Sequence, residues 1–162
     1  MTAAVKPIPA GYHTITPNLV CSNAGAAIEF YKKAFGATEK GGRALLPDGK
    51  VAHAELQIGD STIFINDTMG PASALGPEPK IHPLQLHLYV DNADQVFNRA
   101  VAAGARAEMP LQNMFWGDRY GKVVDPYGHT WAIATHVEDV APQDMERRMR
   151  DFFAKAAAQG RA

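Results

Sequence analysis

The sequence offers little to place it among disulfide-stabilised, membrane-embedded or nucleic-acid-binding proteins. It contains one cysteine, Cys21, so no disulfide can form within the chain, and the apolar surroundings of Cys21 predict a buried residue. No apolar run reaches membrane-spanning length, and residues 1–9 do not resemble a signal peptide. A formal net charge of −1 gives no electrostatic attraction to nucleic acid or an anionic membrane. A cytoplasmic protein without nucleic-acid or membrane partners is expected.

Several well-known chemical motifs are also missing from the sequence. It has no glycine-rich nucleotide-binding motif, no serine-hydrolase elbow and no zinc-finger spacing. What it has is the composition of a packed protein, with 46% hydrophobic and 20% charged residues in a chain of 162. That length fits one ordinary domain or two half-domains.

The first half of the chain alternates in a way that predicts a strand, a helix and three further strands. Asn23 is a candidate N-cap and Gly36 a candidate helix end. Pro17 within the first strand indicates an edge position or a bulge. The predicted elements are residues 13–21, 24–35, 38–46, 51–58 and 61–66, after an N-terminal arm over residues 1–11.

The second half repeats this order after a loop over residues 67–81 that is rich in glycine and proline. The repetition predicts a duplicated module rather than a solenoid. A helix over residues 142–158 follows, and its apolar stripe includes Met145, Met149, Phe152 and Phe153. The predicted elements of the second module are residues 84–90, 91–103, 106–115, 118–124 and 130–135.

The stretch 116–131 is predicted to form a hairpin that carries aromatic, acidic and basic side chains. Val123 and Val124 favour an extended chain. The sequence Asp-Pro-Tyr-Gly at residues 125–128 is typical of a tight turn, and residues 130–134 alternate as a returning strand. Within the hairpin, Trp131 is expected in the core.

Beside the duplicated order of elements, four stretches are informative: the helix end Phe-Tyr-Lys-Lys-Ala-Phe-Gly at 30–36, His-Ala-Glu-Leu at 53–56, Gly-Asp at 59–60, and residues 125–136. In this order and these stretches the sequence resembles the vicinal oxygen chelate superfamily, and more narrowly its PhnB-like branch. That superfamily includes glyoxalase I, bleomycin-resistance proteins and extradiol dioxygenases. The resemblance implies an α+β fold in which two βαβββ modules form one cup-shaped mixed sheet with helices outside. It also implies a homodimer. The corresponding domain spans residues 12–140, with module one at 12–66, a linker at 67–81, module two at 82–140 and a C-terminal helix at 141–162.

Metal-using members of this superfamily hold their ion with one ligand on the first and last strand of each module. The resemblance places those positions near Thr16, Phe64, Gln85 and Ala132. Phe64 and Ala132 have no side-chain donor, and threonine and glutamine are poor replacements for histidine and carboxylate. No metal and no other cofactor are therefore predicted. The alternative is a divalent metal held off that register by His53, Glu55 and His87, with lyase, isomerase or dioxygenase activity of the glyoxalase type.

Strand alternation identifies the side chains opposite the apolar sheet face, and the resemblance makes that face the inside of the cup. His53 and Glu55 lie two residues apart, so they share a face and are either an acid–base pair or a structural hydrogen-bonded pair. With His87 they are the candidate catalytic residues. The predicted ligand-binding residues are Asn18, His53, Glu55, Phe64, Gln85, His87, Trp116, Asp118 and Tyr120.

Two residues of this stretch, Trp116 and Arg119, carry alternatives that the sequence leaves open. Trp116 can stack on a planar ligand or pack in the core. Arg119 can clamp a carboxylate or phosphate, or pair with an acidic neighbour. His129 is expected to serve local turn geometry.

The preferred function is the binding of a small organic molecule in the cup without a metal, as in resistance proteins. Metal-dependent catalysis and an interaction module with a vestigial pocket are the alternatives. Whether the protein is an enzyme is left open by the sequence.

Overall fold

The computed structural model describes residues 9, 11–68 and 84–158, and the chain divides into two compact units, Met1–Lys80 and Ile81–Ala162. Each unit contains one open sheet with a helix against it, and the second unit also carries the C-terminal helix. The predicted α+β class is confirmed, as is the repeated order of elements. No helix among the described residues is both long enough and apolar enough to cross a membrane.

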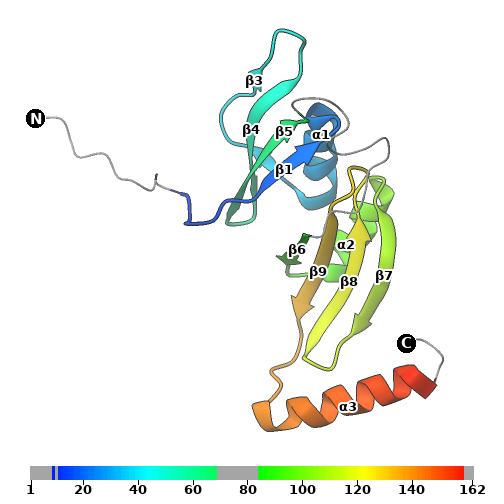
Figure 1. Ribbon diagram of the computed structural model, residues 1–162. Coiled ribbons are helices and arrows are strands. Elements are labelled where there is room, and N and C mark those ends of the chain that lie inside the picture. Colours follow the sequence, from blue (N-terminus) through cyan, green and yellow to red (C-terminus); the bar gives the residue numbers. More distant parts are fainter. Residues whose placement is uncertain (1–8, 10, 69–83, 159–162) are drawn as a thin grey trace, which may run out of the picture. The chain divides into compact units, whose positions relative to one another are not determined.

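The sheet of the first unit has the strand order β1-β5-β4-β2. Figure 1 shows β1, β5 and β4 side by side. Strand β1 pairs parallel with β5, and β4 pairs antiparallel with β5 and β2. Strand β1 therefore lies at an edge of this sheet, as Pro17 indicated. The elements are β1 (Asn18–Cys21), α1 (Ala24–Phe35), β2 (Thr38–Glu39), β3 (Ala44–Leu45), β4 (Val51–Ile58) and β5 (Ser61–Asp67), with β3 also paired to β4.

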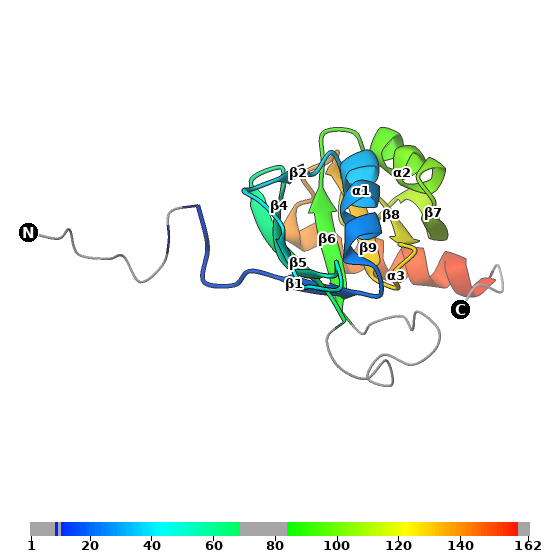
Figure 2. The ribbon, with the colours of Figure 1, turned by 90° about the horizontal axis from the view of Figure 1, so that it is seen from above.

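Helix α1 has the predicted bounds and both predicted ends. The Asn23 side chain accepts a hydrogen bond from the Ala26 N–H at 3.0 Å, and Gly36 ends the helix in the left-handed region with φ 70°. Ile28 and Tyr31 are fully buried, as are Leu56 and Ile65 of the sheet face that the helix covers (Figure 2). The alternation of β4 therefore leaves the opposite face of the sheet to its polar residues.

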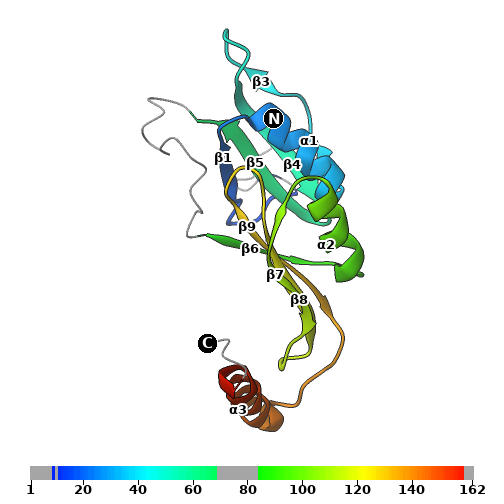
Figure 3. The same cartoon turned by 90° about the vertical axis from the view of Figure 1, so that its right-hand side faces the viewer.

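The second sheet has the order β6-β9-β8-β7, with β6 parallel to β9 and the remaining pairs antiparallel (Figure 3). Its buried layer under α2 includes Val123, Trp131 and Ile133. The predicted hairpin of residues 116–131 is confirmed as β8, the turn and β9. The elements are β6 (Gln85–Tyr89), α2 (Ala93–Ala102), β7 (Arg106–Asn113), β8 (Asp118–Val124), β9 (Thr130–His136) and α3 (Pro142–Ala158).

In both units, a side chain from the last strand accepts a hydrogen bond from the first backbone N–H of the helix. In the first, the Asp67 carboxylate at the end of β5 accepts hydrogen bonds from the N–H groups of Ala24 (2.8 Å) and Val51 (2.7 Å). In the second, the Thr135 hydroxyl near the end of β9 accepts from the Ala93 N–H at 2.7 Å. Each side chain satisfies a helical N–H that has no partner within its own helix. This repeated device supports the duplication predicted from the element order.

Several predicted boundaries were wrong for local reasons. The first strand begins at Asn18 rather than residue 13, because the pairing with β5 starts where the Pro17 carbonyl accepts from the Phe64 N–H. Asp67, assigned to the loop, is the last residue of β5. Residues 38–46 form two short strands, β2 and β3, instead of one. Residues 69–83, most of the predicted loop, and residues 1–8 of the predicted arm lie outside the described residues.

Boundaries in the second module were also set too wide. Helix α2 begins at Ala93, two residues later than predicted, because the Asn92 side chain caps it by accepting from the Gln95 N–H at 2.9 Å. Strand β7 ends at Asn113 because the loop that follows it is closed by the Met114 N–H, which donates to the Asp118 carbonyl.

Helix α3 has the predicted bounds and packs on its own unit. Phe152 contacts a buried cluster that contains Met114 and Tyr120, and its ring centroid lies 5.5 Å from that of Phe115. Arg148 on the helix pairs with Glu138, which follows β9, and donates to its Oε2 at 2.9 Å. Met149 and Phe153 of the apolar stripe are exposed.

Candidate functional site

The polar face of the first sheet brings together three of the predicted site residues. His53 Nε2 lies 3.5 Å from Glu55 Oε1, and both side chains are partly exposed. Glu55 pairs with Phe64 across β4 and β5, so the Phe64 ring lies beside both of them. The His53 and Phe64 rings meet edge to face with centroids 4.9 Å apart. The predicted shared face of His53 and Glu55 is confirmed.

Two residues that the sequence did not single out complete this group. The Tyr12 hydroxyl donates a short hydrogen bond to Glu55 Oε2, and the Tyr12 and Phe64 ring centroids are 6.0 Å apart. Lys40 Nζ lies 4.5 Å from the centre of the Tyr12 ring and donates to the Thr62 hydroxyl at 3.1 Å. The signal for Tyr12 was weak, because it is one aromatic residue in a segment without periodicity.

A hollow of about 560 Å³ opens beside this group. Its size is in the range of pockets that hold small organic molecules. Phe64 and Tyr12 supply apolar surface, and Glu55 supplies a hydrogen-bond acceptor. The lining residues are Pro9, Tyr12, His13, Thr14, Thr16, Glu55 and Phe64.

The charge at this hollow is set by Glu55. The hydrogen bond from the Tyr12 hydroxyl lowers the pKa of Glu55 below its ordinary value, with smaller contributions from His53 and Lys40. The same hydrogen bond raises the pKa of Tyr12, since it stabilises the neutral phenol. At neutral pH the hollow therefore presents an ionised carboxylate next to a neutral phenol.

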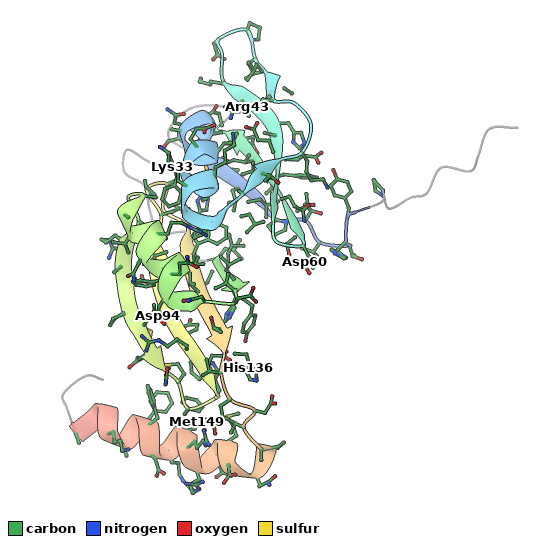
Figure 4. The ribbon with its side chains drawn as sticks, turned by 180° about the vertical axis from the view of Figure 1, so that it is seen from behind. Lys33, Arg43, Asp60, Asp94, His136 and Met149 are labelled. Carbon is green, nitrogen blue, oxygen red and sulfur yellow. The ribbon has the colours of Figure 1, made fainter. Side chains whose placement is uncertain are left out.

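In the second unit, Asp118 is the centre of a hydrogen-bonded cluster. It is 2% exposed, and its Oδ2 accepts from the Tyr89 hydroxyl and the Trp116 indole N–H, both at 2.9 Å. Its Oδ1 lies 2.8 Å from His136 Nδ1, and His136 Nε2 lies 2.9 Å from the exposed Asp139. Figure 4 shows His136 near the end of β9. A second hollow of about 430 Å³ is lined by Tyr89, Val90, Asp91, Thr135 and His136.

Burial raises the pKa of Asp118, but hydrogen bonds from His136, Tyr89 and Trp116 outweigh it, so the net pKa is lowered. Hydrogen bonds to Asp139 and Asp118 raise the pKa of His136 above its ordinary value. The cluster therefore holds an ionised, buried aspartate against a histidine that is readily protonated.

Other predicted residues of the second unit surround Tyr120. Its hydroxyl accepts from the Gln85 amide at 3.4 Å, and its ring centroid lies 5.8 Å from that of His87 and 5.4 Å from that of Trp116. Trp116 is half-buried and packs on the cluster that Phe152 of α3 also contacts. The predicted second-unit residues are therefore brought together, with Asp118 and Tyr120 buried.

The other predicted residues make hydrogen bonds to neighbouring side chains or to the turn. Asn18 donates to the Asn66 side chain at 2.9 Å on the same polar face as Phe64. Arg119 donates twice to Asp94 of α2, at 3.0 and 2.7 Å. Of its two alternatives, Arg119 therefore shows the pairing with an acidic neighbour. His129, as expected, serves the turn through its N–H, which donates to Asp125 at 2.9 Å.

The metal positions implied by the family do not fit this chain. Phe64 lines the hollow with an aromatic ring, and Ala132 is fully buried, so neither side chain has an atom that can bind a metal ion. Among residues 9, 11–68 and 84–158, no three or more histidine, cysteine, aspartate or glutamate side chains are grouped to hold a metal ion. No chemical step is therefore assigned to a metal.

Comparison with known proteins agrees with the fold described above. A Mycobacterium bovis protein described as uncharacterized is 40% identical over 144 residues, which cover 83% of this chain and 91% of that one. TioX from Micromonospora has a TM-score of 0.62 and 26% identity, covering 78% of this chain and 100% of TioX. The PhnB protein from Bacillus cereus has a TM-score of 0.61 and 20% identity, covering 76% and 99%. The model of the Glyoxalase/Bleomycin resistance protein/Dioxygenase superfamily matches residues 12–133. The chain therefore belongs to the glyoxalase/bleomycin resistance/dioxygenase superfamily and has a PhnB-like protein among its structural neighbours.

Proposed function

We propose that this protein binds a small organic molecule on the polar face of its first sheet, without a metal held by the protein. The observation that carries the proposal is the hollow bounded by Tyr12, Glu55 and Phe64. It combines aromatic surface with one ionised acceptor, the usual composition of a site in which a few polar groups orient a mostly apolar ligand. A ligand with an apolar body and a hydrogen-bond donor or positive charge fits this composition.

The contacts within the hollow assign a role to each side chain. Phe64 is braced by His53, whose ring meets it edge to face, and offers a fixed apolar wall. Glu55 is held from two sides by His53 and Tyr12, so its carboxylate is oriented before a ligand arrives. Preorganised groups of this kind lower the entropic cost of binding. Asn18 on the same face and Gln85, His87, Trp116, Asp118 and Tyr120 in the second unit stay predicted ligand contacts.

The experiment is a thermal-shift screen of metabolites and antibiotics against the wild-type protein. A ligand at about 100 times its Kd should add roughly 2.7 kcal/mol of stability. For any hit, Phe64→Ala should weaken binding by on the order of 2 kcal/mol, as removal of a buried aromatic anchor does. Glu55→Gln keeps the shape of the side chain and removes its charge, so it should weaken hits that carry a donor or a cation.

Asp60→Asn is the matched control, because Asp60 is an exposed carboxylate in the turn between β4 and β5 (Figure 4). It should leave the affinity unchanged. Hits that bind Phe64→Ala and Glu55→Gln as tightly as wild type would show that the site lies elsewhere. Assembly as a homodimer and a cytoplasmic location complete the proposal, and size-exclusion chromatography with light scattering and cell fractionation test them.

A further inference from the structure

Both the hydroxyl group and the aromatic ring of the Tyr12 side chain have partners on the first sheet. Its hydroxyl donates to the Glu55 carboxylate, its ring lies tilted beside that of Phe64 with centroids 6.0 Å apart, and the Lys40 ammonium lies 4.5 Å from the ring centre. A carboxylate is the stronger kind of acceptor for a hydroxyl donor, and a cation near the face of a ring is attracted to its electron density. Three separate groups of the sheet side therefore recognise one aromatic ring with its hydroxyl.

Tyr12 belongs to a segment that is lightly held. This segment, residues 11–17 before β1, is called the strap. Among the residues that the structure describes, and apart from the contacts of Tyr12, two hydrogen bonds join the strap to the sheet: a long one from the Thr62 hydroxyl to the Gly11 carbonyl (3.5 Å) and one from the Phe64 N–H to the Pro17 carbonyl. His13, Thr14 and Ile15 are exposed, Ile15 to 82%. Segments with few buried contacts open at low free-energy cost.

We propose that the hollow accepts an aromatic molecule carrying a hydroxyl group, and that this molecule takes the place of the Tyr12 side chain on Glu55 and Phe64. The inference rests on the proposed function and names its ligand class. The strap supplies Tyr12 as an internal occupant, which closes the aromatic position until an external phenol displaces it. The remaining volume of the hollow, about 560 Å³, leaves room for substituents on the ring.

The test uses p-cresol, which reproduces the tyrosine side chain, and 4-methylanisole, in which the hydroxyl is methylated. Both are titrated into wild type and Tyr12→Phe, and the Kd is measured by NMR. Tyr12→Phe loses the hydrogen bond to Glu55, so it competes less and p-cresol should bind it about tenfold more tightly than wild type. 4-Methylanisole should bind both proteins about tenfold more weakly than p-cresol does, since it cannot donate to Glu55.

Tyr89→Phe is the matched control, because its hydroxyl also donates to a carboxylate, that of Asp118 in the other unit. It should leave p-cresol binding at the wild-type value. Equal p-cresol affinity in wild type and Tyr12→Phe, or equal affinity for the two probes, overturns the inference. If library hits depend on Phe64 while p-cresol binds no variant, the proposed function stands and the phenol assignment fails. If no library compound and no p-cresol binds, both the proposed function and the phenol assignment fail.

Discussion

The Asp125 carboxylate and the Trp131 indole are joined across the turn between β8 and β9. Asp125 Oδ2 accepts a hydrogen bond from Trp131 Nε1 at 2.9 Å, and both side chains are buried. The other oxygen, Oδ1, accepts from the backbone N–H groups of Tyr127 and His129, both at 2.9 Å. One carboxylate thus satisfies the turn backbone and fixes the core tryptophan, so the turn and the core are formed together.

Asp125→Ala should lower the free energy of unfolding by roughly 3 kcal/mol or more, because it leaves buried donors without acceptors. Asp125→Asn keeps the shape and should cost less. Asp60→Ala, in the exposed turn between β4 and β5, is the control and should change stability by about 0.5 kcal/mol or less. Urea unfolding followed by tryptophan fluorescence measures all three, and a small effect of Asp125→Ala would contradict the assigned role.

The cluster of Asp118 and His136 predicts a dependence of stability on pH. The pKa of His136 is raised above its ordinary 6.5, so its stabilising contribution is complete below that value and is lost as the pH rises through the folded-state pKa. The pKa of Asp118 is lowered below 3.8, so its contribution is present above that value and is lost only in stronger acid. Between these limits both groups are charged and paired.

His136→Gln should therefore reduce the melting temperature more at about pH 5.5 than at about pH 8.5. Asp139→Asn removes the exposed partner of His136 and should weaken the same dependence in part. Melting curves of wild type and both variants across this range provide the measurement. A difference between wild type and His136→Gln that stays constant with pH would show that the pKa of His136 is the same in the folded and the unfolded protein, and would contradict the raised pKa.

Metal content is the third prediction. Phe64 and Ala132 stand at two of the four positions where metal-using members of the family have ligands, and neither side chain can bind a metal ion. Protein purified without chelator should therefore contain no stoichiometric nickel, zinc, iron or manganese. Elemental analysis of the purified protein checks this. About one tightly held ion per chain, lost in His53→Ala or His87→Ala, would instead favour the metal-dependent alternative.

The sequence predicted elements whose signals are local and missed contacts that depend on tertiary structure. Helix α1 was placed to the residue because Asn23 and Gly36 act on their own helix. The alternation of β4 placed His53 and Glu55 on one face, since strand period alone decides that. Tyr12 and Lys40 were missed because they meet Glu55 only after residues far apart in the chain fold together. The buried hydrogen bonds of the Asp67 and Asp125 carboxylates were missed because an aspartate near a turn is first interpreted as a turn residue.

The last prediction concerns α3, whose apolar stripe was expected to pack on its own module or across a dimer interface. In the structure the helix packs on its own module through Phe152. Met149 and Phe153 are exposed, Phe153 to 59%. Truncation after Val140 should expose the cluster that Phe152 covers and reduce solubility or dissociate a dimer.

Phe152→Ala and Phe153→Ala separate these two roles of α3. The neighbours differ in burial, so Phe152→Ala should lower the free energy of unfolding by about 2 kcal/mol or more, and Phe153→Ala should have little effect on it. If the exposed stripe forms the dimer interface, Phe153→Ala should shift the protein towards monomer at equal concentration without changing its fold. Analytical ultracentrifugation with circular dichroism measures both quantities. A protein truncated after Val140 that remained soluble, dimeric and equally stable would remove α3 from either role.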